Sequence, residues 1–183
     1  MKLERRIRRL SEKRDALMAD LEALPPSHLT ARPISGKWSI LDIVEHLVLA
    51  ERVVLQGLPS PSELSERKRL LKHRILYLVV LFVLKARIRV RVPSSKMVPR
   101  GGHTFHELHS QWDSTHLWLQ DYIAQLNPED HRRTVFRHPV AGPVTLAQAI
   151  QLDSAHVDGH LRQIRRLIRL VANSESKRSH VVS

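Results

Sequence analysis

Apolar residues recur at helical spacing in four stretches of the chain, at residues 2–24, 39–56, 105–126 and 145–172. In the first stretch they are three, four or seven positions apart, which places them on one face of an amphipathic helix. The stretches are separated by prolines and glycines, so each predicts a separate helix. Four such helices in 183 residues predict one all-α domain over residues 1–172, built as a four-helix bundle.

The ends of these helices carry local signals. Ser39 with Asp42, and Thr104 with Glu107, fit the capping box that opens a helix. Thr145 with Gln148 fits the same pattern at the start of the last helix. Pro25 and Pro26 end the first helix, residues 128–144 are expected to form a long structured loop, and residues 173–183 a flexible tail.

Residues 62–98 do not fit a plain bundle and predict an elaboration between the second and third helices. Ile75 to Leu84 is an unbroken apolar run of ten, which as a helix spans roughly 15 Å, about half of a bilayer core. It is therefore too short for a comfortable transmembrane helix. A helix buried in the bundle, or at the interface of a homodimer, explains the run. So does a segment that contacts a membrane surface or an acidic partner through flanking basic residues.

The positive charge of the chain is local. Residues 65–91 contain nine Lys and Arg and one acid, Glu66, and so carry +8 of the net +12. Only 4% of the residues are aromatic, which leaves little to stack on bases, and a nucleic-acid partner is not expected. The first residues lead directly into a charged helical pattern without an apolar signal segment, so a cytoplasmic location is the default expectation, with membrane association through residues 65–91 as a possibility.

Two histidines in the last predicted helix suggest a metal site. His156 and His160 are four residues apart on the inward stripe, so their imidazoles lie one turn apart on the same face. The chain has no cysteine, so a metal ion must be held by His, Asp or Glu. His46, on the apolar face of the second helix, is the candidate third ligand. The same spacing also arises by chance in a histidine-rich chain.

Three further residues are candidates for supporting roles. Asp42 and Asp153 lie one turn before His46 and His156, and could accept hydrogen bonds from the imidazole N–H groups. Asp42 is explained equally well as a helix cap. His138, in the loop before the last helix, is either an acid/base at the mouth of the site or a residue that sets the local loop geometry. Five other histidines are expected at the surface: His103, His106, His109, His116 and His131.

The chain resembles the DinB-like (damage-inducible) superfamily of four-helix bundles. The resemblance rests on three segments: the Trp-Ser entry to the second helix with His46 at its centre, the His-Pro…Gly…Thr stretch 138–145, and the H-x-x-x-H-x-x-Q-I run 156–164. It covers most of the chain and is weakest over residues 62–98. By motif it implies that His46, His156 and His160 are the metal ligands.

The resemblance leaves the reaction open, because the superfamily includes metal-dependent hydrolases, transferases of low-molecular-weight thiols and proteins without an assigned activity. The expected cofactor is a divalent ion, Zn²⁺ or Ni²⁺ first, then Fe²⁺ or Mn²⁺. The expected substrate is a small molecule that the ion activates or that reacts with an activated water or thiol. The competing hypothesis is a non-catalytic stress-response or binding scaffold that docks through its basic segment.

Overall fold

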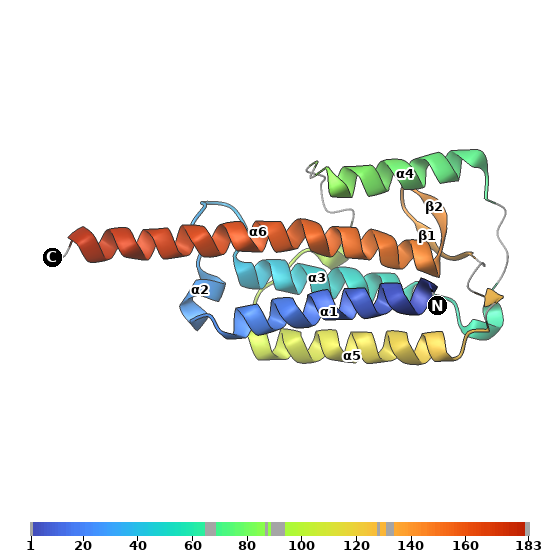
Figure 1. Cartoon of the computed structure of the whole chain (residues 1–183), viewed down its shortest axis with the longest axis horizontal. Coiled ribbons are helices and arrows are strands. Elements are labelled where there is room, and N and C mark those ends of the chain that lie inside the picture. The colour runs from blue at the N-terminus through green and yellow to red at the C-terminus, as the bar shows by residue number, and fades with distance from the viewer. Residues whose placement is uncertain are drawn as a thin grey trace.

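The fold is a bundle of four long helices, seen in a computed structural model that describes residues 2–64, 69–86, 88, 94–127, 129–130 and 134–181. The bundle helices are α1 (Lys2–Glu22), α3 (Ile40–Gln56), α5 (Phe105–Ala124) and α6 (Leu146–Val181). They lie side by side along the long axis of the molecule (Figure 1). The predicted all-α bundle is therefore confirmed. The basic residues Arg67, Lys68, Arg87, Arg89 and Arg91, and His131, lie outside the described residues.

The core forms where the predicted apolar faces meet. Leu10 and Leu21 of α1, Ile43 and Leu47 of α3, and Trp112 of α5 are each at most 2% exposed. Ile164 and Leu167 complete this core from α6, as their helical spacing predicts. Burial of these side chains is the main force that assembles the bundle.

The capping boxes form as predicted. Ser39 Oγ accepts a hydrogen bond from Asp42 N (3.1 Å), and Ser39 N donates to Asp42 Oδ2 (2.7 Å). Thr104 and Glu107 make the same reciprocal pair at the start of α5. Thr145 N donates to Gln148 Oε1 (3.1 Å) and fixes the start of α6. These bonds satisfy backbone N–H groups that the first turn of a helix leaves without partners.

Ser39→Ala is expected to lower the free energy of unfolding by about 1 kcal/mol, because Asp42 N loses its buried acceptor. Urea unfolding followed by circular dichroism measures the change. Ser110→Ala, at an exposed position inside α5, is the matched control and should change stability by less than about 0.5 kcal/mol. Equal losses in the two variants would contradict a capping role for Ser39.

The structure adds one short helix to the predicted elements and corrects two local predictions. The linker after Pro25 contains a short helix, α2 (Pro26–Thr30), which starts at a proline because the first turn of a helix needs no N–H there. The expected loop 128–144 contains strand β1 (Thr134–His138), which pairs antiparallel with β2 (Gly142–Thr145). Finally, α6 continues to Val181 instead of ending at residue 172, and it extends well past the bundle (Figure 1).

The elaboration after α3 contains η1 (Pro61–Glu63), helix α4 (Leu71–Lys85) and η2 (Ser95–Met97). Helix α4 lies outside the bundle, along α6 and beside the hairpin (Figure 1). Tyr77 and Leu81 are its buried residues, and they contact a small second core formed by Ala141, Val144, Ala149, Leu152 and Ala155. The expectation that the apolar run is buried inside the bundle is therefore wrong. Among the described residues, no helix is both long and apolar enough to cross a bilayer.

Candidate metal centre

Three histidines from two distant helices converge on one point. His46 comes from the middle of α3, and His156 and His160 lie one turn apart on α6. His156 Nε2 lies 3.1 Å from His46 Nε2 and 3.1 Å from His160 Nε2. All three ligand atoms lie within 4.8 Å of one another. The predicted trio of imidazoles is therefore brought together.

The outer nitrogens of two of these rings are fixed by acceptors. A carbonyl oxygen can only accept, so the 2.7 Å contact between His46 Nδ1 and Met97 O places a proton on that nitrogen. His160 Nδ1 likewise faces Gln163 Oε1 at 3.1 Å. In the neutral rings this leaves the Nε2 lone pairs of His46 and His160 facing His156 Nε2. A second partner that fixes the tautomer is typical of metal-ligating histidines.

Burial keeps the three imidazoles neutral. Desolvation, together with the neighbouring His160 and His46, lowers the pKa of His156 to about 3. The same burial lowers the pKa of His160 to about 4, against the opposing effect of the Gln163 hydrogen bond. The pKa of His46 is also lowered by desolvation. Neutral imidazole is the form that binds a metal ion, so these rings need not lose a proton at pH 7.

The donor set and its spacing fit a divalent ion. At metal–nitrogen distances of about 2.0–2.1 Å, tetrahedral ligand nitrogens lie roughly 3.3 Å apart, close to the two contacts of 3.1 Å. Hydrogen bonds cannot account for both 3.1 Å contacts, because the Nε2 atoms of His46 and His160 carry lone pairs and a neutral His156 has at most one proton on Nε2 to donate. A cation between the three nitrogens would accept all of their lone pairs. Three ligands leave at least one coordination position open.

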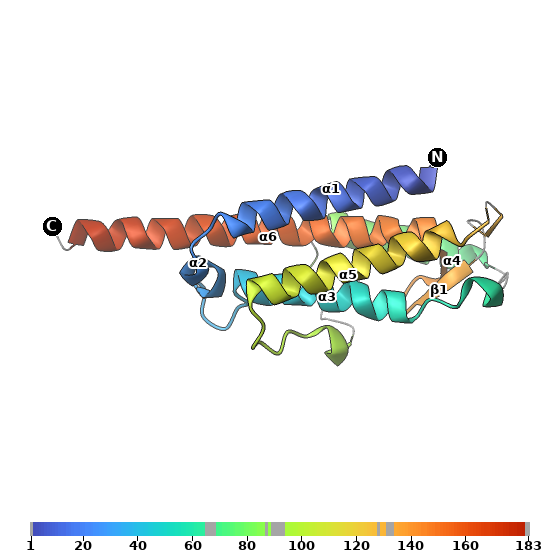
Figure 2. The same ribbon diagram turned by 90° about the horizontal axis from the view of Figure 1, so that it is seen from below.

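A backbone segment closes one side of the centre. Residues 94–104 pass alongside α3, on the side of α3 away from α1 (Figure 2). Glu45, next to His46, accepts hydrogen bonds from Arg100 N (2.9 Å) and Gly101 N (3.0 Å). Gly101 has φ +75°, a conformation that favours glycine. Trp38 packs against the His46 ring, with the ring centroids 5.0 Å apart. Two adjacent residues of α3 therefore contact this segment: His46 through Met97 O, and Glu45 through two backbone amides.

The supporting roles predicted for the two aspartates are not found. Asp42 is occupied by the Ser39 cap and by Arg32 Nη2 at 2.7 Å, while the acceptor for His46 is Met97 O. Asp153 lines a small apolar cavity inside the bundle and, within the described part of the chain, makes no hydrogen bond to His156. Asp42 is a capping residue, and Asp153 lines the small cavity between the helices.

His138 takes part in the turn of the hairpin. Its Nδ1 accepts hydrogen bonds from Val140 N (3.2 Å) and Ala141 N (3.1 Å). Desolvation lowers its pKa, so the ring is neutral and able to accept. These bonds favour a structural role for His138, and an acid/base role stays a prediction.

A second buried polar cluster was not expected from the sequence. Glu51 of α3 accepts a hydrogen bond from Trp112 Nε1 of α5, and Glu51 Oε1 lies 3.2 Å from His116 Nε2. His116 Nδ1 in turn contacts Ser11 Oγ of α1 at 3.2 Å. His116 is 3% exposed, which corrects its expected place at the surface. Helical spacing from Trp112 to His116, on the apolar stripe, was the available signal.

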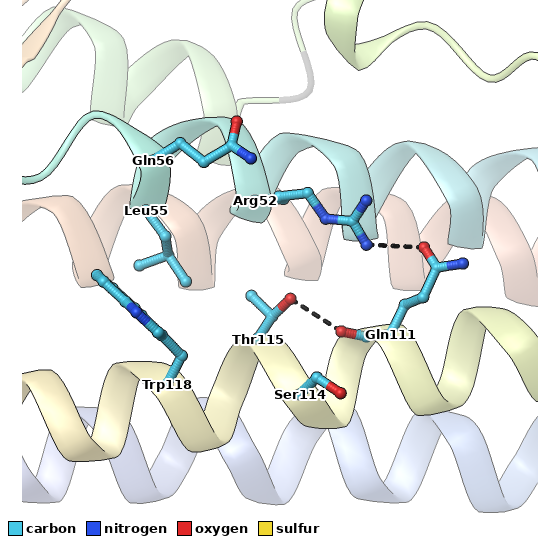
Figure 3. Close-up of a pocket in the computed structure, with 7 residues that line it drawn as sticks. All are labelled: Arg52, Leu55, Gln56, Gln111, Ser114, Thr115 and Trp118. Carbon is cyan, nitrogen blue, oxygen red and sulfur yellow. Dashed lines mark hydrogen bonds between the residues drawn. The ribbon is translucent and has the colours of Figure 1, made fainter.

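A groove of about 480 Å³ lies between α3 and α5, apart from the histidine cluster. Arg52, which donates to Gln111 Oε1 (2.8 Å), forms its polar part, and Leu55 and Trp118 form its apolar part (Figure 3). None of the three histidines lines this groove. The groove is therefore separate from the histidine cluster, where His156 and His160 are partly exposed.

Comparisons with known proteins agree with this architecture. The solved structure of YfiT from Bacillus subtilis, described as a probable metal-dependent hydrolase with an unusual four-helix bundle topology, is similar to this chain with a TM-score of 0.56. The match covers 93% of this chain and 87% of YfiT at 18% sequence identity, and it shows a shared fold. No curated protein matches the chain. The family model of the DinB superfamily matches residues 9–164, and the chain belongs to that superfamily.

Proposed function

We propose that this protein is a divalent-metal-dependent enzyme in which His46, His156 and His160 hold the ion. The observation that carries the proposal is the convergence of three neutral imidazole nitrogens, with 3.1 Å contacts, at a partly exposed point between α3 and α6. Zn²⁺ and Ni²⁺ suit a site of imidazole ligands, and Fe²⁺ or Mn²⁺ are the alternatives.

The all-nitrogen ligand set determines what the ion would contribute. Three neutral ligands leave the double positive charge of the ion uncompensated, and a bound ion would lower the pKa of a water or thiol at its open position by several units. The residues of the chain have a different task. Met97 O and Gln163 Oε1 hold the His46 and His160 rings so that Nε2 faces the ion site. Glu45 keeps the segment that carries Met97 in place.

The proposed reaction is hydrolysis of a small molecule or transfer of a low-molecular-weight thiol to an electrophile. Hydrolysis is supported by the description of YfiT. Thiol transfer rests on the resemblance drawn from the sequence motifs, which implies both kinds of activity. Both reactions need a nucleophile activated at the open position of the ion, a water for hydrolysis and a thiol for transfer. A panel of ester, amide and electrophilic substrates, tested with and without added thiol, separates them.

Metal analysis tests the site independently of any substrate. The wild-type protein, reconstituted with Zn²⁺ or Ni²⁺ and desalted, is expected to retain about one ion per chain by elemental analysis. His156→Ala, and His156→Ala combined with His160→Ala, should retain only trace amounts, because each change removes a ligand that contacts the others.

His106→Ala is the matched control, since His106 is exposed on α5 and should leave the metal content unchanged. Equal metal content in the wild type and the His156→Ala variant would refute the site. A site that binds metal but supports no turnover on any substrate would instead favour the scaffold hypothesis.

A further inference from the structure

Helix α4 has two apolar faces, and only one of them is covered. On the inner face, Tyr77 and Leu81 are 7% and 9% exposed and pack against α6 and the hairpin. His73, one turn before Tyr77, lies so close to Gly142 that a Cβ at residue 142 would come within 3.0 Å of its ring. These contacts fix which side of α4 faces the protein, and therefore which side faces away from it.

The opposite side, here called the outer face of α4, presents large apolar side chains to solvent. Phe82 is 63% exposed and Leu78 61% exposed. The outer face consists of Leu71, Ile75, Leu78, Val79 and Phe82. Their spacing places them along one stripe of the helix. Of the eleven large apolar residues found exposed in the described chain, seven lie between residues 70 and 88. A concentration of this kind marks an interaction surface.

Basic residues flank the outer face. Lys72, Arg74 and Lys85 are exposed on α4 itself. Along the sequence, residues 65–91 carry a net +8, with Glu66 as the single acid. An apolar stripe bordered by lysine and arginine is the pattern of helices that lie in the interface of an anionic membrane, where the bases meet lipid phosphates and the apolar side chains enter the acyl boundary.

We propose that the outer face of α4 docks on the surface of an anionic lipid bilayer, with the helix parallel to the surface and the bundle behind it. Helix α4 has 15 residues and is about 22 Å long, so it lies on the bilayer without crossing it. Its place at the edge of the molecule, on the far side of α6 from the core of the bundle, leaves this surface accessible (Figure 1).

A second copy of the chain is a less suitable occupant. A symmetric dimer formed through the outer face would bring Lys72, Arg74 and Lys85 of one copy close to those of the other, and like charges in contact oppose association. An anionic bilayer provides the opposite charge and an apolar phase together. The charge of residues 65–91 is therefore complementary to the membrane and not to itself.

Vesicle co-sedimentation tests the proposal with the full-length protein. Binding is expected to vesicles of phosphatidylcholine mixed with phosphatidylglycerol, and to be several-fold weaker with phosphatidylcholine alone. It should also weaken as salt is raised from about 0.1 M to about 1 M, which shortens the Debye length from about 10 Å to about 3 Å. Leu78→Asp should reduce the partition coefficient roughly tenfold or more, because it puts a charge where an apolar side chain enters the bilayer.

Leu117→Asp is the matched control, because Leu117 is also 61% exposed but lies on α5, outside the outer face of α4. It should bind vesicles like the wild type, and both variants should keep the wild-type circular dichroism spectrum. Equal binding by the two variants, or equal binding to neutral and anionic vesicles, would overturn the proposal. So would a dimer that Leu78→Asp converts to monomer without any vesicle binding by the wild type. Repeating the assay with His156→Ala separates docking from the metal centre, since docking should be unaffected.

Discussion

Replacing Trp112 by alanine is expected to lower the free energy of unfolding by about 3–5 kcal/mol, the largest effect of any single change considered for this protein. Trp112 is 1% exposed in the centre of the core, so its removal leaves a cavity that the surrounding helices cannot fill. It also removes the indole N–H that donates to Glu51, and a buried carboxyl oxygen then loses its partner.

Two further variants separate these contributions. Trp112→Phe keeps most of the ring volume but removes the donor, and should cost about 1–3 kcal/mol. Trp118→Ala, on the same helix at a residue 45% exposed, should cost less than about 1 kcal/mol. Urea unfolding at equilibrium measures all three. If Trp112→Ala and Trp118→Ala were equally destabilised, Trp112 would not be the central residue of the core.

The second large effect is a pH dependence that comes from buried carboxyls. Burial, together with the charge of Asp153, raises the pKa of Glu51 from 4.5 to about 8. Burial also raises the pKa of Asp153 from 3.8 to about 7. The folded protein therefore holds these protons more tightly than the unfolded chain does. The resulting stability is fully present below the unfolded pKa values and is lost as pH rises through about 7–8.

Glu51→Gln is expected to reduce this loss. A glutamine accepts the Trp112 hydrogen bond and has an amide to place near His116 Nε2, as a protonated Glu51 would, but it cannot ionise. The wild type should lose stability relative to this variant between about pH 5 and pH 9, by an amount on the order of 2–4 kcal/mol.

Urea unfolding in the presence of a chelator, at several pH values, measures the difference without any contribution from metal. Glu63→Gln, at an exposed position, is the control and should follow the wild type at every pH. The interpretation fails if Glu51→Gln also follows the wild type, because a carboxyl that ionises freely in the folded state contributes no such slope.

The sequence predicts the bundle well because helical periodicity and capping are local. Ser39 with Asp42, and Thr104 with Glu107, are three residues apart, and their pairing needs no information from elsewhere in the chain. The hairpin was missed because Pro139 and Gly142 dominate the local signal, while the pairing of Thr134 with Thr145 depends on contacts across a turn. Residues 173–181 likewise show no apolar periodicity that would predict the continuation of α6 to Val181.

The metal centre was predicted in part for the same reason. His156 and His160 share a face by spacing alone, and Gln163, three residues after His160, lies within the same helical turn. By contrast, no local pattern connects His46 with Met97, which lies 51 residues away. Asp42 lies one turn from His46, so the local sequence favours it as the acceptor although Met97 O fills that role. The apolar run of α4 shows the same limit of local patterns. Only one side of this helix is buried, although all ten residues from Ile75 to Leu84 are apolar.

The contact between His46 and Met97 has a consequence for which mutations the protein can tolerate. The acceptor is a peptide oxygen, and every residue type at position 97 supplies one. Point substitutions of Met97 should therefore preserve the tautomer of His46. An insertion or deletion between residues 97 and 100 would change the distance between that oxygen and the two amides that donate to Glu45. The number of residues in this stretch is therefore constrained, whereas the residue type at position 97 is not.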